Sequence, residues 1–223
     1  MLRKDYLVRM IEEMTEILGK VFDLKQRRKW TEALWELDEL YKRQFRLNSA
    51  LLGSLSAKDT VELFRTGGQV EADKLQSLAR LLREEGELFT ESGERDEGIL
   101  RQMKALHLFL AAAQYGADRN VWKLDEEIGQ LLTRLKGYRL PADTERLLLA
   151  YEESEGRYDR AEDALYRLLR LGAADKEEGV NFYRRLLTLT QERLERGGLP
   201  EEEVREGMDS WLERGWAPAE DNE

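Results

Sequence analysis

His107 is the only histidine of the 223-residue chain, and histidine is the side chain that most often carries acid–base chemistry near neutral pH. Lys104 lies one helical turn before it, so the two side chains share one side of a helix. Together they could line a small-ligand pocket or take part in catalysis. The surrounding residues are apolar, which favours the ordinary interpretation of a histidine packed at a helix interface and bonded to a neighbour.

The densest charge cluster of the predicted helix 70–91 contains Arg80 and Glu84, with Arg83, Glu85 and Glu87 beside them. Two carboxylates could serve as general acid and general base. Arg80 and Glu84 are equally well placed for an ordinary i,i+4 ion pair on a solvated face, and the pattern favours this interpretation. If the helix is the inner member of a hairpin, the cluster would instead line a concave binding surface.

The two segments are expected to form one antiparallel helical hairpin around Gly93. His107 lies about 14 residues after this turn and Arg80 about 13 before it, which places both about 20 Å from the turn. We therefore predict a ligand- or partner-binding site on one concave, partly exposed surface. Its residues are Arg80, Glu84, Lys104 and His107.

Other chemistries are excluded by composition. The absence of cysteine excludes disulfides, thiolate metal sites, iron–sulfur clusters and a cysteine nucleophile. A single histidine excludes zinc or di-iron sites that need a histidine pair. The pairs Gly67-Gly68 and Gly197-Gly198 lack the strand before them and the Lys-Ser/Thr after them that a phosphate loop requires. No catalytic residue, metal or cofactor is predicted, and we expect the chain not to be an enzyme.

The elements that position these residues are predicted to be helices. The chain has 39 leucines against seven valines and four isoleucines, and leucine favours helices where β-branched residues favour strands. Helical spacing and glycine breaks predict an all-α fold of about ten helices and no strand. The predicted helices are 5–28, 30–52, 56–66, 70–91, 94–115, 119–136, 141–155, 159–171, 175–196 and 200–214.

The first of these helices carries an unusually wide apolar stripe. Leu7, Met10, Met14, Ile17, Val21 and Leu24 recur at alternating spacings of three and four residues, and Ile11, Leu18 and Phe22 widen the stripe. A stripe this wide is typical of a helix that packs against more than one partner.

Two turns in the chain repeat one another. Trp30-Thr31-Glu32-Ala33 and Tyr158-Asp159-Arg160-Ala161 are each followed by leucines at the same offsets of seven and ten residues. A small residue at this place lets two helices approach closely, so Ala33 and Ala161 should both be buried. Gly93 to Gly98 is a weaker copy of the same pattern. Repetition of a helical hairpin is typical of an α-solenoid.

The segment Leu148-Leu149-Ala150-Tyr151, followed by Gly156 to Ala161 and Leu165, resembles a tetratricopeptide repeat. Its spacer is one residue too long, and Ala173-Ala174 stands where a proline is expected. The resemblance implies a divergent tetratricopeptide-like array of helical hairpins, an α-solenoid.

Residues 1 to about 115 carry a second resemblance, in four stretches: Asp5 to Glu12, Gly67 to Val70, Leu81 to Leu88, and Lys104 to Leu108. In the residues and order of these stretches, the chain is similar to an uncharacterised bacterial family, mostly from Firmicutes, of small helical proteins with a domain of unknown function. The resemblance implies a helical, tetratricopeptide-like, intracellular protein. It implies no activity and no site residues.

The charge distribution bears on partners and location. The net charge is −10, of which residues 200–223 carry −7, so the rest of the chain has no cationic footprint for nucleic acid. The basic run 25–29 is interpreted as cations at the negative end of a helix dipole. No apolar run reaches the roughly 18 residues of a membrane span, and no signal peptide is recognised, so a cytoplasmic protein is expected. We predict one domain over 1–215 and an acidic, disordered tail over 216–223, with Trp216 docked on the last helix or on a partner.

The function predicted from these features is that of a protein- or peptide-binding adaptor of unknown pathway, because stacked hairpins form grooves that bind extended peptides or helices. A small-ligand sensor or enzyme with a pocket around Lys104 and His107 is the runner-up. A structural homodimer, formed through the leftover apolar face of the first helix or the last one, is the third hypothesis.

Overall fold

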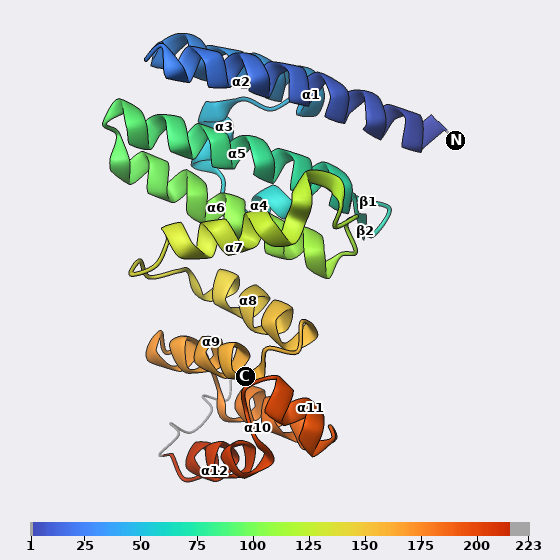
Figure 1. Cartoon of the computed structure of the whole chain (residues 1–223), viewed down its shortest axis with the longest axis vertical. Helices are drawn as coiled ribbons and strands as arrows, with labels where there is room; N and C mark the ends of the chain where they lie inside the picture. The colour runs from blue at the N-terminus through green and yellow to red at the C-terminus, as the bar shows by residue number, and fades with distance from the viewer. Residues whose placement is uncertain (1, 215–223) are drawn as a thin grey trace, which may run out of the picture. The chain divides into compact units, whose positions relative to one another are not determined.

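The computed structural model describes the backbone of residues 2–214 and the side chains of residues 5–214. Within that range the chain folds into twelve α-helices, one 3₁₀ turn and one short hairpin of strands, which confirms the all-α prediction (Figure 1). The chain divides into two compact units, unit 1 up to Arg139 and unit 2 from Leu140. The predicted tail 216–223 and Trp216 lie outside the described residues.

Unit 1 contains the longest helices of the described chain. In order, its elements are α1 (Leu2–Gln26), α2 (Trp30–Phe45), α3 (Ser49–Ser54), α4 (Ala57–Glu62), β1 (Arg65–Thr66), β2 (Gln69–Val70), α5 (Ala72–Ser92), α6 (Arg95–Gln114), η1 (Val121–Lys123) and α7 (Leu124–Arg134). Helices α1 and α2 form an antiparallel pair that packs on α5, and α7 packs on α6 (Figure 1). No helix of the described chain is long and apolar enough to cross a bilayer.

The α5–α6 hairpin is the centre of unit 1, and it turns at Gly93 as the sequence predicts. Gly93 ends α5 with φ +104°, a conformation that glycine adopts without strain. Five residues later the two helices touch, because a Cβ on Gly98 would lie 2.2 Å from Oγ1 of Thr90. With α1 and α2 on one side and α7 on the other, α5 and α6 are covered from several directions. Most of the side chains of α5 are therefore buried.

Two predicted helices are each broken in two. The segment predicted as helix 30–52 stops at Phe45, because Arg46 adopts the left-handed conformation with φ +57° and Asn48 then caps α3 by accepting a hydrogen bond from the Leu51 amide at 2.8 Å. The predicted helix 175–196 ends at Leu186 and a new helix begins at Gln191. Neither break carries the glycine or proline on which the boundary prediction relied.

The prediction of no strand is wrong at one place. Gly67 and Gly68 were expected to end a helix, but both have positive φ, 58° and 82°, and they close a tight hairpin. Arg65 pairs with Val70 and Thr66 with Gln69 in antiparallel register. Two consecutive residues with positive φ form the turn that joins strands of a two-residue hairpin, which explains why this glycine pair gives strands.

Unit 2 consists of α8 (Ala142–Ser154), α9 (Tyr158–Arg170), α10 (Lys176–Leu186), α11 (Gln191–Arg196) and α12 (Glu201–Leu212). Helices α8 and α9 form a hairpin, and α10 packs on α12. Ala161 of α9 is fully buried, as is Ala33 in unit 1, so both predictions for these alanines are confirmed. The ring of Trp211 lies directly on Gly179, where a Cβ would be only 2.0 Å from the indole.

Candidate functional site

Arg80 and Glu84 of α5 form the ion pair that their spacing predicts. The guanidinium donates a hydrogen bond to the Glu84 carboxylate at 3.1 Å. Both side chains are mostly buried, so this pair does not lie on the solvated face that the sequence favoured. The helices packed around α5 supply the reason.

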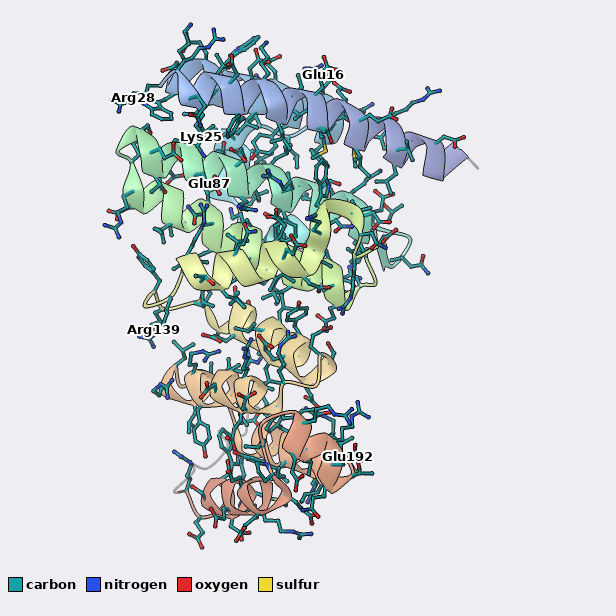
Figure 2. All side chains as sticks on the ribbon, in the orientation of Figure 1. Glu16, Lys25, Arg28, Glu87, Arg139 and Glu192 are labelled. Atoms are coloured by element: carbon teal, nitrogen blue, oxygen red, sulfur yellow. The ribbon has the colours of Figure 1, made fainter. Side chains whose placement is uncertain are left out.

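The C-terminal turn of α1 brings Lys25 onto the same face of α5. Its ammonium lies 3.7 Å from Glu84, 2.9 Å from Glu87 and 2.8 Å from Glu91. Figure 2 shows Lys25 and Glu87 facing each other between the two helices. Lys25 belongs to the basic run that the sequence assigns to the end of a helix dipole. In the structure its ammonium joins α1 to three carboxylates of α5.

Helix α7 adds charges on the other side of this face. Glu127 accepts a hydrogen bond from Arg83 and lies 3.7 Å from Arg80, and Arg134 lies 2.6 Å from Glu87. We call the whole set the α1/α5/α7 network. It comprises Lys25, Arg80, Arg83 and Arg134 with Glu84, Glu87, Glu91 and Glu127.

The network keeps its central carboxylate ionised. Burial alone would raise the pKa of Glu87, but the hydrogen bond and charge of Lys25, with the charges of Arg134 and Arg83, hold this pKa below its usual value. Each carboxylate of the network has at least one cation within ion-pair distance. The arrangement is therefore suited to holding three helices together.

Lys104 lies in a different environment, against the end of α3. Its ammonium donates hydrogen bonds to the carbonyl oxygens of Leu52 and Leu55, the latter at 2.5 Å. These carbonyls belong to the end of a helix, where the intrahelical donors run out, so Lys104 acts as a C-terminal cap. Burial, with a contribution from the charge of Arg101, lowers the pKa of Lys104 to about 8.

His107 is buried, with 5% of its surface exposed. This burial agrees with a histidine packed at a helix interface and not with a partly exposed surface shared with Arg80 and Glu84. Lys104 contacts α3 whereas Arg80 contacts α7, so these two cations serve different contacts. Equal distance from the Gly93 turn fixes the height of a residue along the hairpin but not the direction of its side chain.

A second buried polar cluster, of which the sequence singles out only Glu85, lies between α2, α5 and α6. Tyr41 donates a hydrogen bond to Glu85 at 3.3 Å, and Nε of Arg101 lies 3.2 Å from the same carboxylate. Burial raises the pKa of Glu85 although Arg101 opposes the shift. The guanidinium of Arg101 also lies over Gly53, where a Cβ would be 2.7 Å from it. This cluster is enclosed, so it too is a packing contact.

The model of a family of unknown function, DUF6483, matches residues 1–214. The chain belongs to this family. No curated protein and no solved structure matches it. Family membership therefore agrees with the resemblance to an uncharacterised family but assigns no activity to this DUF6483 member.

Unit 2 contains a surface cleft that the sequence did not predict. It has a volume of about 570 Å³ and lies where the α8–α9 turn meets α11. We call it the arginine cleft, and its lining includes Gly156, Arg157, Tyr158, Thr190, Arg193 and Arg196. The repeated turn at Tyr158 is a sequence signal for one of these residues, but nothing in the local pattern singles out Arg193.

Among residues 5–214, no group of three or more His, Asp or Glu side chains is arranged to hold a metal ion. The described part of unit 1 has a further surface cleft of about 620 Å³, at the end of α1, lined by Lys25, Gln26, Arg28, Trp30 and Glu91. Lys25 and Glu91 of this lining are already paired with one another at 2.8 Å. The arginine cleft is therefore the better candidate for binding.

Proposed function

We propose that this protein is a protein-interaction module and that its interaction surface is the outer face of α1. The observation that supports the proposal is a second apolar stripe on this helix, beside the stripe that packs into unit 1. We define the outer stripe as Val8, Ile11, Thr15, Leu18 and Phe22.

The two stripes differ sharply in exposure. Met10, Met14 and Val21 of the inner stripe are buried against the rest of unit 1. In the outer stripe Val8 is 47% exposed and Phe22 is 59% exposed, while Ile11 and Leu18 are half-buried. Exposed apolar side chains that recur along one face of a helix, rather than singly, are typical of a protein-interaction surface. The wide apolar stripe of the sequence thus has one partner within the chain and room for another.

The spacing of the outer stripe favours a helix as the partner. Its residues recur at intervals of three, four, three and four, which is the pattern of a helix that packs along another helix. The pattern is nearly symmetric about Thr15, because Val8 and Phe22 each lie seven residues from it, while Ile11 lies four residues before it and Leu18 three after it. In an antiparallel pair Val8 would meet Phe22 of the other helix, Ile11 would meet Leu18, and the two Thr15 side chains would face each other.

This symmetry makes a second copy of the chain the occupant that we propose. An interface in which the same patch serves both partners is the common arrangement in homodimers. The adaptor and homodimer hypotheses are then compatible. A dimer formed through α1 would present the other surfaces of the protein to further partners. A binding role rather than a catalytic one is supported by the α1/α5/α7 network, whose carboxylates are all engaged by cations.

We further propose that the hairpins are of divergent tetratricopeptide type. Support comes from the two repeated turns, where Ala33 and Ala161 are both fully buried at the start of a helix. Tyr158, which corresponds to Trp30 in the repeat, is also buried.

The first test is the mass of the protein in solution, measured by light scattering after size exclusion. We expect the wild-type chain to be a dimer and Phe22→Glu to be a monomer at the same concentration, since a charge in the stripe would be buried without a partner. Trp35→Glu is the matched control. Trp35 is 58% exposed on α2, outside the outer stripe, so this variant should remain a dimer.

The second test uses the absence of cysteine from the sequence. Thr15→Cys should form a disulfide-linked dimer under mild oxidation because the register places two copies of residue 15 opposite each other. Trp35→Cys should not. A wild-type chain that is monomeric at its highest soluble concentration, or a Phe22→Glu variant that stays dimeric, would overturn the proposal.

A further inference from the structure

We propose that the arginine cleft of unit 2 binds a carboxylate group, and that Arg193 and the hydroxyl of Tyr158 hold it. The proposal concerns a different unit from the α1 surface and does not depend on it. It rests on two hydrogen-bond donors that have no acceptor among the described residues, the hydroxyl of Tyr158 and the terminal nitrogens of Arg193. It also rests on the fixed position of Tyr158 and on the charge of the lining.

Tyr158 is fixed in place by the backbone around it. The residue is 1% exposed, and its ring lies so close to Gly197 that a Cβ there would be 2.2 Å from it. The Gly197 carbonyl oxygen also accepts hydrogen bonds from the amides of Tyr158 and Asp159, at 2.9 and 3.2 Å. The start of α9 is therefore tied to the end of α11, and the hydroxyl of Tyr158 is held at one place in the cleft.

The hydroxyl of Tyr158 has one hydrogen-bond partner in the described chain, and that partner is a donor. Nε of Arg193 donates to the hydroxyl oxygen at 2.9 Å. The hydroxyl hydrogen has no acceptor among residues 5–214. A buried hydroxyl normally uses its hydrogen, so an acceptor from outside the chain would complete this site.

Arg193 is the second unused donor. Its guanidinium has no carboxylate within ion-pair distance in the described part of the chain, in contrast to the two other arginines of the cleft. Arg157 is paired with Glu152, and Arg196 lies 2.8 Å from Glu192. Because Nε of Arg193 donates to Tyr158, the two terminal nitrogens are the donors that can bind a ligand, and they form a planar fork. Such a fork matches the two oxygens of a carboxylate.

The charge of the lining favours a singly charged ligand. Arg157 and Arg196 are each paired with a glutamate, so the excess is the positive charge of Arg193, which no carboxylate of the described residues pairs. A carboxylate would neutralise this excess, whereas a dianionic phosphate would add a negative charge beside two glutamates. The volume of the cleft is in the range of small-molecule sites, so it can take the end of a peptide or a small carboxylic acid.

The test is a titration of the full-length protein by calorimetry with four probes: N-acetyl-trialanine with a free C-terminal carboxylate, the same peptide as its C-terminal amide, succinate, and inorganic phosphate. We expect the free peptide, succinate or both to bind, and the amide not to bind. Binding of the peptide alone identifies a peptide terminus as the source of the carboxylate. Binding of succinate alone identifies a small acid, and binding of both identifies the carboxylate group itself.

Three variants assign the donors. Arg193→Gln should weaken binding about tenfold or more, because it removes a charge-assisted bidentate contact. Tyr158→Phe should weaken it about two- to tenfold, because it removes one hydrogen bond and keeps the ring. The matched control is Arg205→Gln on α12, where the arginine is exposed and lies 2.5 Å from Glu201 in the same unit. This variant should bind as the wild type does.

The proposal is overturned if none of the four probes binds, if phosphate binds more tightly than either carboxylate, or if the amide binds as well as the free peptide. It is also overturned if Arg193→Gln binds like the wild type. Thermal melting of each variant separates loss of the ligand contact from loss of the fold, and Arg193→Gln should melt near the wild-type temperature.

Discussion

Arginine and glutamate build both the α1/α5/α7 network of unit 1 and the arginine cleft of unit 2, with opposite results. In the network, Arg80 and Arg83 each face a carboxylate of α5 and also Glu127 of α7, and the side chains are mostly buried. In the cleft, Arg193 contacts a hydroxyl and has no carboxylate within ion-pair distance among the described residues. The same pair of residue types therefore supports packing in one unit and an open donor in the other.

Whether an arginine contributes to packing or to binding therefore depends on the groups that its guanidinium contacts. A buried arginine with several carboxylates has its charge and its donors satisfied, and removing one partner leaves an uncompensated charge. An arginine that lies at a cleft without a carboxylate partner is solvated by water, so it changes the stability of the fold little. This water is displaced when an anion binds. Four variants, from the largest expected effect to the smallest, test this contrast and the apolar packing that the two units share.

Glu87→Ala should be the most destabilising change. It removes the carboxylate that Lys25, Arg83 and Arg134 share, and it leaves the four cations of the network with three carboxylates. We expect a loss of about 3–5 kcal/mol in the free energy of unfolding, measured by urea denaturation. The control is Glu192→Ala on α11, whose side chain is 82% exposed, and there the loss should stay within about 1 kcal/mol. Equal losses for the two variants would contradict the contrast.

The network should also weaken in acid. The pKa of Glu87 is lowered in the folded state from its ordinary value of 4.5, so the folded protein binds this proton less readily than the unfolded chain does. The stabilisation is present above pH 4.5 and is lost as the pH falls toward the folded-state pKa. The difference in stability between the wild type and Glu87→Ala should therefore shrink below pH 4.5.

Ala161→Phe tests apolar packing, which the two units have in common. Ala161 is fully buried in unit 2 and Ala33 is fully buried in unit 1, each at the start of a repeated turn. A phenylalanine at either position should overpack the helix contact at a cost of about 1–3 kcal/mol, measured by thermal or urea unfolding. Ala50→Phe, at an exposed position on α3, is the control. A melting temperature of Ala161→Phe equal to that of the wild type would show that the repeat alignment is wrong.

Lys104→Met tests a cation whose partners are carbonyl groups. The pKa of Lys104 is lowered from 10.5 to about 8 in the folded state, so between these values the unfolded chain binds more protons than the folded one. The wild type should gain stability relative to Lys104→Met as the pH rises from about 8 to 10.5, by at most about 1.4 kcal/mol per pH unit. Urea unfolding at a series of pH values measures this gain. A difference that is flat, or that falls with pH, would be inconsistent with a desolvated ammonium.

Arg193→Gln should have the smallest effect on stability, within about 0.5 kcal/mol, because no carboxylate of the described chain depends on it. Urea unfolding in the absence of any carboxylate ligand measures this effect. A large loss would show that the arginine is part of the packing of unit 2, as its counterparts are in unit 1, and the contrast between the two regions would disappear.

The parts of the fold that the sequence predicts are those encoded by local signals. Ser56 caps α4 by accepting a hydrogen bond from the Asp59 amide at 3.0 Å, Gly93 turns the α5–α6 hairpin, and Arg80 pairs with Glu84 one turn away. The break after Phe45 carries no such signal, because an arginine adopts the left-handed conformation there. Side-chain propensity alone does not favour that conformation.

The site residues escape prediction for a different reason. Lys25 and Glu87 are 62 residues apart, and Arg193 and Tyr158 are 35 apart, so only the tertiary fold brings them together. The distance from the Gly93 turn predicts only the height of His107 along the hairpin, because the rotation of a helix about its axis depends on which neighbours cover it. Helices α5 and α6 are covered from several sides, and the polar face expected of a half-exposed helix is absent there.

The contact between Gly179 and Trp211 limits the substitutions that members of the family can accept at these two positions. Alanine at position 179 would place a Cβ 2.0 Å from the indole, and the indole N–H is held by the Lys176 carbonyl oxygen at 3.1 Å, so the ring has little freedom to move away. A smaller ring at position 211 alone would leave a void. Each substitution is costly by itself, and each relieves the other. Across members of DUF6483 these two positions should therefore be inherited as a pair, with glycine opposite tryptophan and a larger residue only where the indole is lost.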